Sequence, residues 1–84
     1  MYSVEFLSSA ARALAALERG VQRRISRRID RLAEDPRAGG AVKLRASDDV
    51  WRVRVGDYRI LYRVEDARLT VLVIRVGHRR DVYR

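Results

Sequence analysis

Two short apolar segments within WRVRVGDYRILYR, residues 51–63, carry arginines that alternate with apolar side chains. Arg52 and Arg54 belong to the first segment, and Arg59 and Arg63 belong to the second. A guanidinium group keeps its charge at any ordinary pH and matches the oxygen pairs of phosphate and carboxylate groups. Two interpretations follow: an ordinary polar face of a sheet, or a surface that binds a phosphate chain.

The alternation predicts a β-hairpin that turns at Gly56-Asp57. Because side chains of a strand alternate between two faces, one face is apolar and the other carries the four arginines. The apolar face comprises Trp51, Val53, Val55, Tyr58, Ile60, Tyr62 and Val64. Like charges on neighbouring strands repel, so a face chosen for solubility alone would mix charges. The absence of an acidic residue among the four arginines favours the phosphate-binding interpretation.

A strand and two helices are predicted before this hairpin. Residues 2–6 alternate as a short strand, and Ser8 or Ser9 is the expected N-cap of a first helix that stops at Gly20. Its apolar stripe is predicted to comprise Ala10, Leu14 and Leu17.

The second helix is predicted over residues 21–36, with Pro36 marking its end. Its apolar residues recur at helical spacing: Val21, Ile25, Ile29 and Leu32. Arginines cover the remaining surface, and we interpret them as a solvated face rather than as a contact with substrate: Arg23, Arg24, Arg27, Arg28 and Arg31.

Strand patterns dominate the rest of the chain, at residues 42–44, 50–55, 58–64 and 69–76. The last of these is apolar on both sides, which predicts a central position in the sheet. The predicted fold class is α+β, with an N-terminal strand and two helices packed on one face of a small, mainly antiparallel sheet. Residues 1–84 are expected to form a single domain.

Composition restricts the classes of function. The 84 residues carry a formal net charge of +8, and 18 of the 19 basic residues are arginine. A GC-rich genome would favour arginine, but the charge also predicts an acidic partner, either nucleic acid or an acidic protein. The chain has no cysteine and one histidine, so we expect neither a disulfide nor a metal site. No apolar run long enough to span a membrane and no signal peptide is apparent, which predicts a cytoplasmic protein.

The C-terminal stretch RVGHRRDVYR gathers several groups that could act on a phosphate. It brings an imidazole, guanidinium groups and a phenol within a few positions: His78, Arg79, Arg80, Tyr83 and Arg84. Taken alone, this stretch is also compatible with an ordinary basic C-terminus.

Over essentially its whole length the chain resembles the RelE branch of the RelE/ParE toxin superfamily. The most specific segments are GDYRILYRV and VGHRRDVY. The resemblance implies a RelE-like domain that cleaves mRNA as a metal-independent endoribonuclease without a cofactor. It also implies that cleavage takes place on the ribosome, near the 16S ribosomal RNA of the A site. A cognate antitoxin is expected to silence the toxin in a hetero-oligomeric complex.

The resemblance assigns roles to particular residues. The catalytic basic pair of the family falls on Arg52 and Arg54, its central-strand arginine on Arg59, its late arginine on Arg79 and its C-terminal tyrosine on Tyr83. Arg63 and Arg80 are expected to bind RNA phosphates.

One departure from the family affects the mechanism. The best-known members have lysine at the positions of Arg52 and Arg54, and arginine effectively cannot lose its proton. A general base would therefore have to be Tyr83, His78, a ribosomal group or water.

Two other functions remain open on the sequence: a non-catalytic inhibitor of DNA gyrase resembling the ParE branch, and a passive RNA-binding module. Retention of Tyr83 and of the arginines favours the ribonuclease.

Overall fold

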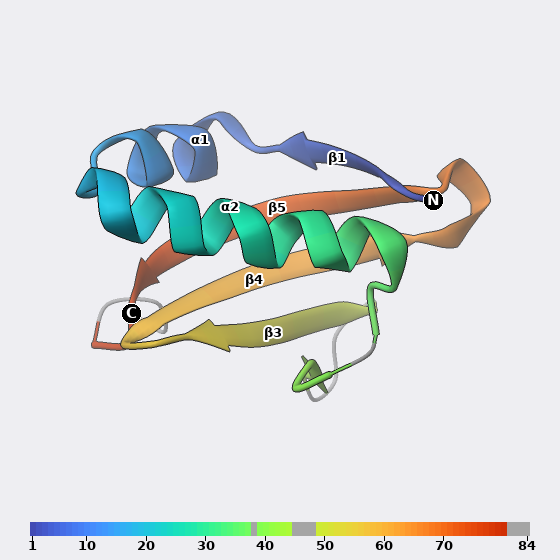
Figure 1. The fold of residues 1–84 in the computed structure, drawn as a ribbon. Helices are drawn as coiled ribbons and strands as arrows, with labels where there is room; N and C mark the ends of the chain where they lie inside the picture. The colour runs from blue at the N-terminus through green and yellow to red at the C-terminus, as the bar shows by residue number, and fades with distance from the viewer. Residues whose placement is uncertain (38, 45–48, 81–84) are drawn as a thin grey trace.

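The computed structural model describes residues 1–37, 39–44 and 49–80. Along the chain its elements are β1 (Ser3–Phe6), α1 (Ser8–Ala15), α2 (Arg19–Glu34), β2 (Val42–Lys43), β3 (Val50–Val55), β4 (Tyr58–Glu65), a 3-10 turn (Asp66–Arg68) and β5 (Thr70–His78). The five strands form one sheet in the order β1-β5-β4-β3-β2. Only β1 and β5 pair in parallel among the described strands. Both helices lie on one side of this sheet (Figure 1), which confirms the predicted α+β class.

The core lies between α2 and the sheet. Ile25, Ile29 and Leu32 of α2 are buried, which confirms the apolar face that the spacing predicted. They meet the inward positions of the three long strands: Val53, Ile60, Tyr62, Val64, Val71, Val73 and Val76. Each fully buried aliphatic side chain of this size contributes roughly 1.5–3 kcal/mol to folding. Packing of this face fixes α2 against the hairpin that carries the arginines.

The start of α1 differs from the prediction. Neither Ser8 nor Ser9 is the N-cap, because Ser8 is already the first helical residue and Leu7 precedes it without a side-chain cap. The Leu7 N–H donates to the Val73 carbonyl oxygen at 3.0 Å, so the pairing of β1 with β5 continues to the residue before the helix. Leu7 is the one residue between strand and helix, and its side chain has no polar atom that could cap the helix.

The predicted helix stop at Gly20 is also wrong. The first helix ends at Ala15, and Gly20 lies in the first turn of α2, which begins at Arg19. The side chain of Gln22 explains this boundary, because its Nε2 donates to the carbonyl oxygens of Ala15 at 2.9 Å and Leu17 at 2.7 Å. These bonds satisfy carbonyls that the end of a helix leaves without partners.

The strand β5 lies between β1 and β4, an interior position that agrees with its apolar character on both sides. Its register against β4 contains an irregularity between Leu61 and Tyr62, whose partners are Arg75 and Val73. The pairing therefore skips Ile74, as in a β-bulge. The strand continues to His78, two residues beyond the predicted end.

Candidate functional site

The β3–β4 hairpin places the predicted arginines on the face of the sheet opposite the helices. Val53 pairs with Ile60 on the helix side, and both are buried. The neighbouring pairs, Arg52 with Leu61 and Arg54 with Arg59, therefore project to the other face, as does the pair formed by Val50 and Arg63. We call this face, with Arg52, Arg54, Arg59 and Arg63, the arginine face.

The hairpin closes as the sequence predicted. Gly56 and Asp57 are the two residues between β3 and β4, and Gly56 has a φ of +59°. Only glycine adopts this backbone conformation without a steric penalty, so Gly56 sets the register that aligns Arg54 with Arg59.

Two guanidinium nitrogens on the arginine face are shielded from solvent without a hydrogen-bond partner in the described part of the chain. They are one terminal nitrogen of Arg59 and the Nε of Arg63. A buried donor left unsatisfied costs roughly 1–3 kcal/mol, and a charged one costs more. An anion reaches these two nitrogens only if the side chains that shield them move, and it would then supply the missing acceptors.

The end of β5 lies beside Arg59. Its partner on β5 is Gly77, which presents no side chain. The backbone N–H of Arg79 donates to the carbonyl oxygen of Asp57 at 2.8 Å, so the end of β5 is held against the hairpin turn. The exposed Arg79 therefore lies close to the hairpin end of the arginine face.

His78 does not share this face. It pairs with Tyr58, and their rings meet edge to face with centroids 5.6 Å apart. Because Tyr58 precedes Arg59 in the same strand, the two project to opposite faces, and His78 lies with Tyr58. Its Nδ1 accepts the backbone N–H of Arg80 at 3.3 Å. The predicted proton-transfer candidate is thus separated from the arginine face by the sheet. Tyr83 and Arg84 lie outside the described residues, and Arg80 is exposed.

Arg54 brings the arginine face into contact with a second group of arginines. Its Nε donates to the Gly56 carbonyl oxygen at 2.9 Å. Arg54 also lines a hollow together with four arginines of α2: Arg24, Arg27, Arg28 and Arg31. From the sequence, these α2 residues were interpreted as part of a solvated face. Their spacing of three and four residues places them on one side of the helix, and this signal was available in the sequence.

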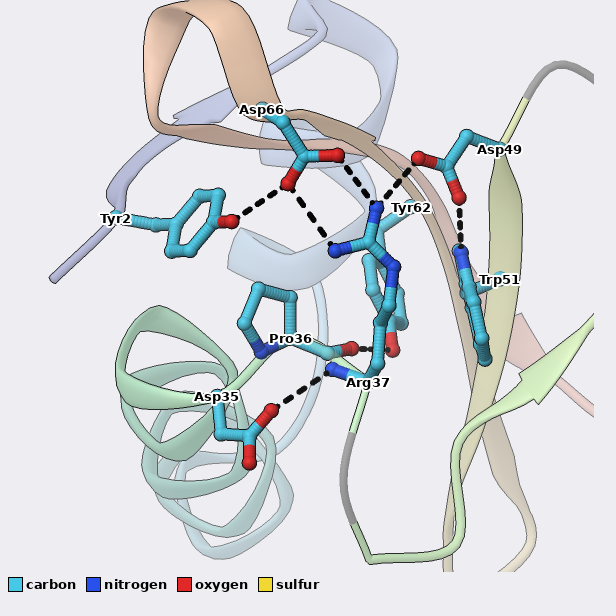
Figure 2. Close-up of polar contacts among 8 residues, drawn as sticks. All are labelled: Tyr2, Asp35, Pro36, Arg37, Asp49, Trp51, Tyr62 and Asp66. Carbon is cyan, nitrogen blue, oxygen red and sulfur yellow. Dashed lines mark hydrogen bonds and ion pairs between the residues drawn. The ribbon is translucent and has the colours of Figure 1, made fainter.

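A polar cluster around Arg37 holds the far end of β3, next to Arg52. Figure 2 shows the Arg37 guanidinium between two carboxylates. It forms two bonds with Asp66, at 2.8 and 3.1 Å, and one with Asp49 at 2.6 Å. Trp51 Nε1 donates to the other oxygen of Asp49 at 2.6 Å, and the Trp51 ring lies 5.7 Å from the guanidinium carbon of Arg37. The cluster thereby fixes the side chain that precedes Arg52.

Electrostatics of this cluster favour its charged form. The hydrogen bonds from Arg37 and Tyr2 lower the pKa of Asp66 to about 2. The bond from Trp51, followed by that from Arg37, lowers the pKa of Asp49. Tyr2 donates to Asp66 at 2.6 Å (Figure 2), which ties the N-terminus to the turn between β4 and β5. Arg37 was not predicted from the sequence, because its two carboxylate partners come from distant segments and no spacing links them.

The comparisons with known proteins agree with this architecture. Residues 3–83 match the family described as the ParE toxin of the type II toxin-antitoxin system parDE. Toxin RelG of Mycobacterium tuberculosis is 34% identical over 84 residues, which cover 99% of this chain and 97% of that protein. The chain therefore belongs to the ParE toxin family of type II toxin-antitoxin systems, within the RelE/ParE superfamily.

Solved structures show the same fold. The isolated RelE toxin of Escherichia coli superposes with a TM-score of 0.85 at 28% identity, covering 93% of this chain and 84% of that chain. The toxin-antitoxin complex RelBE2 of Mycobacterium tuberculosis gives a TM-score of 0.80 at 30% identity, covering 92% and 96%. In the described part of the chain, neither helix is long and apolar enough to cross a membrane.

Proposed function

We propose that this toxin is an endoribonuclease that cleaves mRNA on the ribosome and so inhibits translation. The observation that carries the proposal is the arginine face, where buried nitrogens of Arg59 and Arg63 have no hydrogen-bond partner among the described residues. A phosphodiester supplies acceptor oxygens of the right charge for such donors. The likeness to RelE toxins adds support.

The chemistry requires little beyond positioning and positive charge. The 2′-hydroxyl of RNA attacks the adjacent phosphorus, a 2′-oxygen–phosphorus bond forms, and the bond to the 5′-oxygen breaks. A base takes the proton of the 2′-hydroxyl, and the leaving 5′-oxygen gains a proton. The products are a 2′,3′-cyclic phosphate and a 5′-hydroxyl. Cations around the phosphoryl oxygens stabilise the charge that builds up in the transition state.

The arginines have distinct roles in this proposal. Arg59 holds a phosphoryl oxygen at the centre of the face, and Arg52, Arg54 and Arg79 supply charge around it. Arg63 and Arg80 bind neighbouring phosphates. Tyr83 stacks on a base or assists proton transfer. His78 is the weaker candidate for the proton, because it lies on the other face of the sheet with Tyr58.

An antitoxin is the second partner in the proposal. A solved structure similar to this chain contains a RelE-family toxin bound to its antitoxin. The charge of +8 favours a partner that presents carboxylates. Such a partner would occupy guanidinium groups and prevent binding of the toxin to the ribosome.

Expression without an antitoxin tests the proposal. Primer extension on a reporter mRNA should reveal new ends within the coding sequence, and these ends should carry a 5′-hydroxyl that polynucleotide kinase can phosphorylate. Gyrase inhibition is the competing function. Intact transcripts beside relaxed plasmid DNA would support it and overturn the ribonuclease proposal.

A further inference from the structure

The hollow between α2 and β3 is lined by five arginines and has a volume of about 380 Å³. Four of them lie on α2, and the fifth, Arg54, also belongs to the arginine face. Val55 is the one apolar residue among its described lining residues. A protein partner normally needs apolar anchors at the centre of its interface, whereas a nucleic-acid backbone needs cations.

Two features of the fold bring these arginines together. Positions 24, 27, 28 and 31 share one side of α2, which flanks the residues that face the core. The partner of β3 on its outer edge, β2, pairs only with Trp51 and Arg52. Beyond Arg52 this edge is therefore not covered by β2, and Arg54 and Val55 line the hollow there.

Two of the five arginines are held by backbone acceptors. Arg54 donates to the Gly56 carbonyl oxygen, and Arg28 donates to the Gly39 carbonyl oxygen. Arg24, Arg27 and Arg31 are exposed, and no ion pair of theirs is present within residues 1–37, 39–44 and 49–80. The guanidinium of Arg24 lies 3.5 Å from where a Cβ on Gly56 would be, so it adjoins the hairpin turn. The hollow thus concentrates positive charge beside the arginine face.

We propose that this hollow is a second phosphate-binding site, which holds an RNA backbone apart from the phosphate that is cleaved. The proposal rests on the function proposed above. It extends the contact with RNA from the cleaved phosphate to a row of arginines along the backbone. This row runs from Arg59 on the sheet, through Arg54 at the edge of β3, to Arg27 and Arg31 on α2. The RNA is either a continuation of the cleaved strand or a segment of ribosomal RNA next to it.

The test compares two double variants with equal charge. Arg27→Gln/Arg31→Gln removes two cations from the hollow, and Arg12→Gln/Arg23→Gln removes two exposed cations that do not line it. Dissociation constants are measured, over a range of salt concentrations, for a single-stranded RNA of about 12 nucleotides and for small ribosomal subunits. Single-turnover cleavage at saturating toxin is measured in parallel, because the α2 residues should affect binding and not the chemical step.

The hollow variant should bind about tenfold more weakly than the control variant. Its plot of log affinity against log salt should have a shallower slope by about 1.4, since each of the two lost phosphate contacts to a single strand contributes roughly 0.7. Weaker binding of the oligonucleotide assigns the hollow to the cleaved strand, and weaker binding confined to the subunit assigns it to ribosomal RNA.

Equal affinities of the two variants in both assays would overturn the proposal. So would a selective loss of binding to poly-glutamate with unchanged binding to RNA, because the hollow would then accept an acidic protein. If the wild-type toxin binds RNA but never cleaves it, the ribonuclease function fails, while the comparison of affinities still decides whether the hollow binds phosphate.

Discussion

Arg54 lies directly opposite Arg59 in the antiparallel register of β3 and β4. Like charges in such a cross-strand pair destabilise a sheet, so this pair is unfavourable in the free protein. A bound phosphate would replace the repulsion with two charge-assisted interactions. The pair therefore connects the stability of the fold to its proposed function.

Replacing Arg59 should abolish cleavage and leave the fold intact. Arg59→Ala removes the central cation, and loss of one such stabilising group typically lowers the rate by about 100-fold or more. Cleavage of reporter mRNA is measured at matched protein levels, with circular dichroism to verify folding. Arg23→Ala, an exposed position on α2 outside the hollow, is the control. Equal loss in both variants would mean that overall charge matters and the site does not.

Replacing Arg63 should maintain or increase the stability of the fold. Its Nε is buried and has no hydrogen-bond partner in the described part of the chain, so Arg63→Leu removes an unsatisfied donor. In urea unfolding, we expect the free energy of unfolding of the variant to equal that of the wild type or to exceed it by up to about 1 kcal/mol. RNA binding should weaken in the same variant. A stability loss of more than about 1 kcal/mol would show that Arg63 has a structural role instead.

The Arg37 cluster predicts a loss of stability in acid. The pKa of Asp66 is about 2 in the folded state and 3.8 ordinarily, so its ionised form stabilises the fold above pH 3.8 and this contribution is lost as the pH falls towards 2. The urea midpoint of the wild type should therefore fall between about pH 5 and about pH 2 more steeply than that of Asp66→Asn. Asp30→Asn, on the exposed side of α2, is the control. Identical pH profiles for the wild type and Asp66→Asn would contradict the assignment.

The sequence was sufficient to predict the parts of the fold that depend on local burial. Alternation in β3 and β4 predicted the arginine face, and the spacing of Ile25, Ile29 and Leu32 predicted the buried side of α2, because in each case the pattern follows directly from the geometry of one element. The end of α1 was not predictable in this way. It depends on Gln22 reaching back to two carbonyl oxygens, and glycine at position 20 gave a misleading signal.

The surroundings of the candidate site depend on contacts between elements. The hollow at Arg54 requires α2 to lie beside the uncovered edge of β3, and the periodicity of α2 does not specify which strand the helix lies beside. The side of the sheet occupied by His78 follows from the register with Tyr58, and the cluster at Arg37 joins the chain after α2 to the residue before β3 and the turn after β4. These relationships arise on folding. The sequence therefore predicted the residues of the arginine face, and the structure shows which residues surround them.

Neutralisation by an antitoxin gives the last prediction. An acidic partner can act by covering the arginine face or by displacing the segment after Gly77, and displacement would break the backbone bond from Arg79 to Asp57. Within the described residues, the segment after Gly77 also contacts the hairpin through the pairing of His78 with Tyr58, so displacement costs these two contacts and leaves the core intact, and we expect displacement. Amide hydrogen exchange of the free toxin and of its antitoxin complex distinguishes the two: displacement predicts faster exchange at Arg79 in the complex. Unchanged exchange at Arg79, with new protection confined to the strands that carry Arg52 and Arg59, would instead show that the antitoxin covers the arginine face.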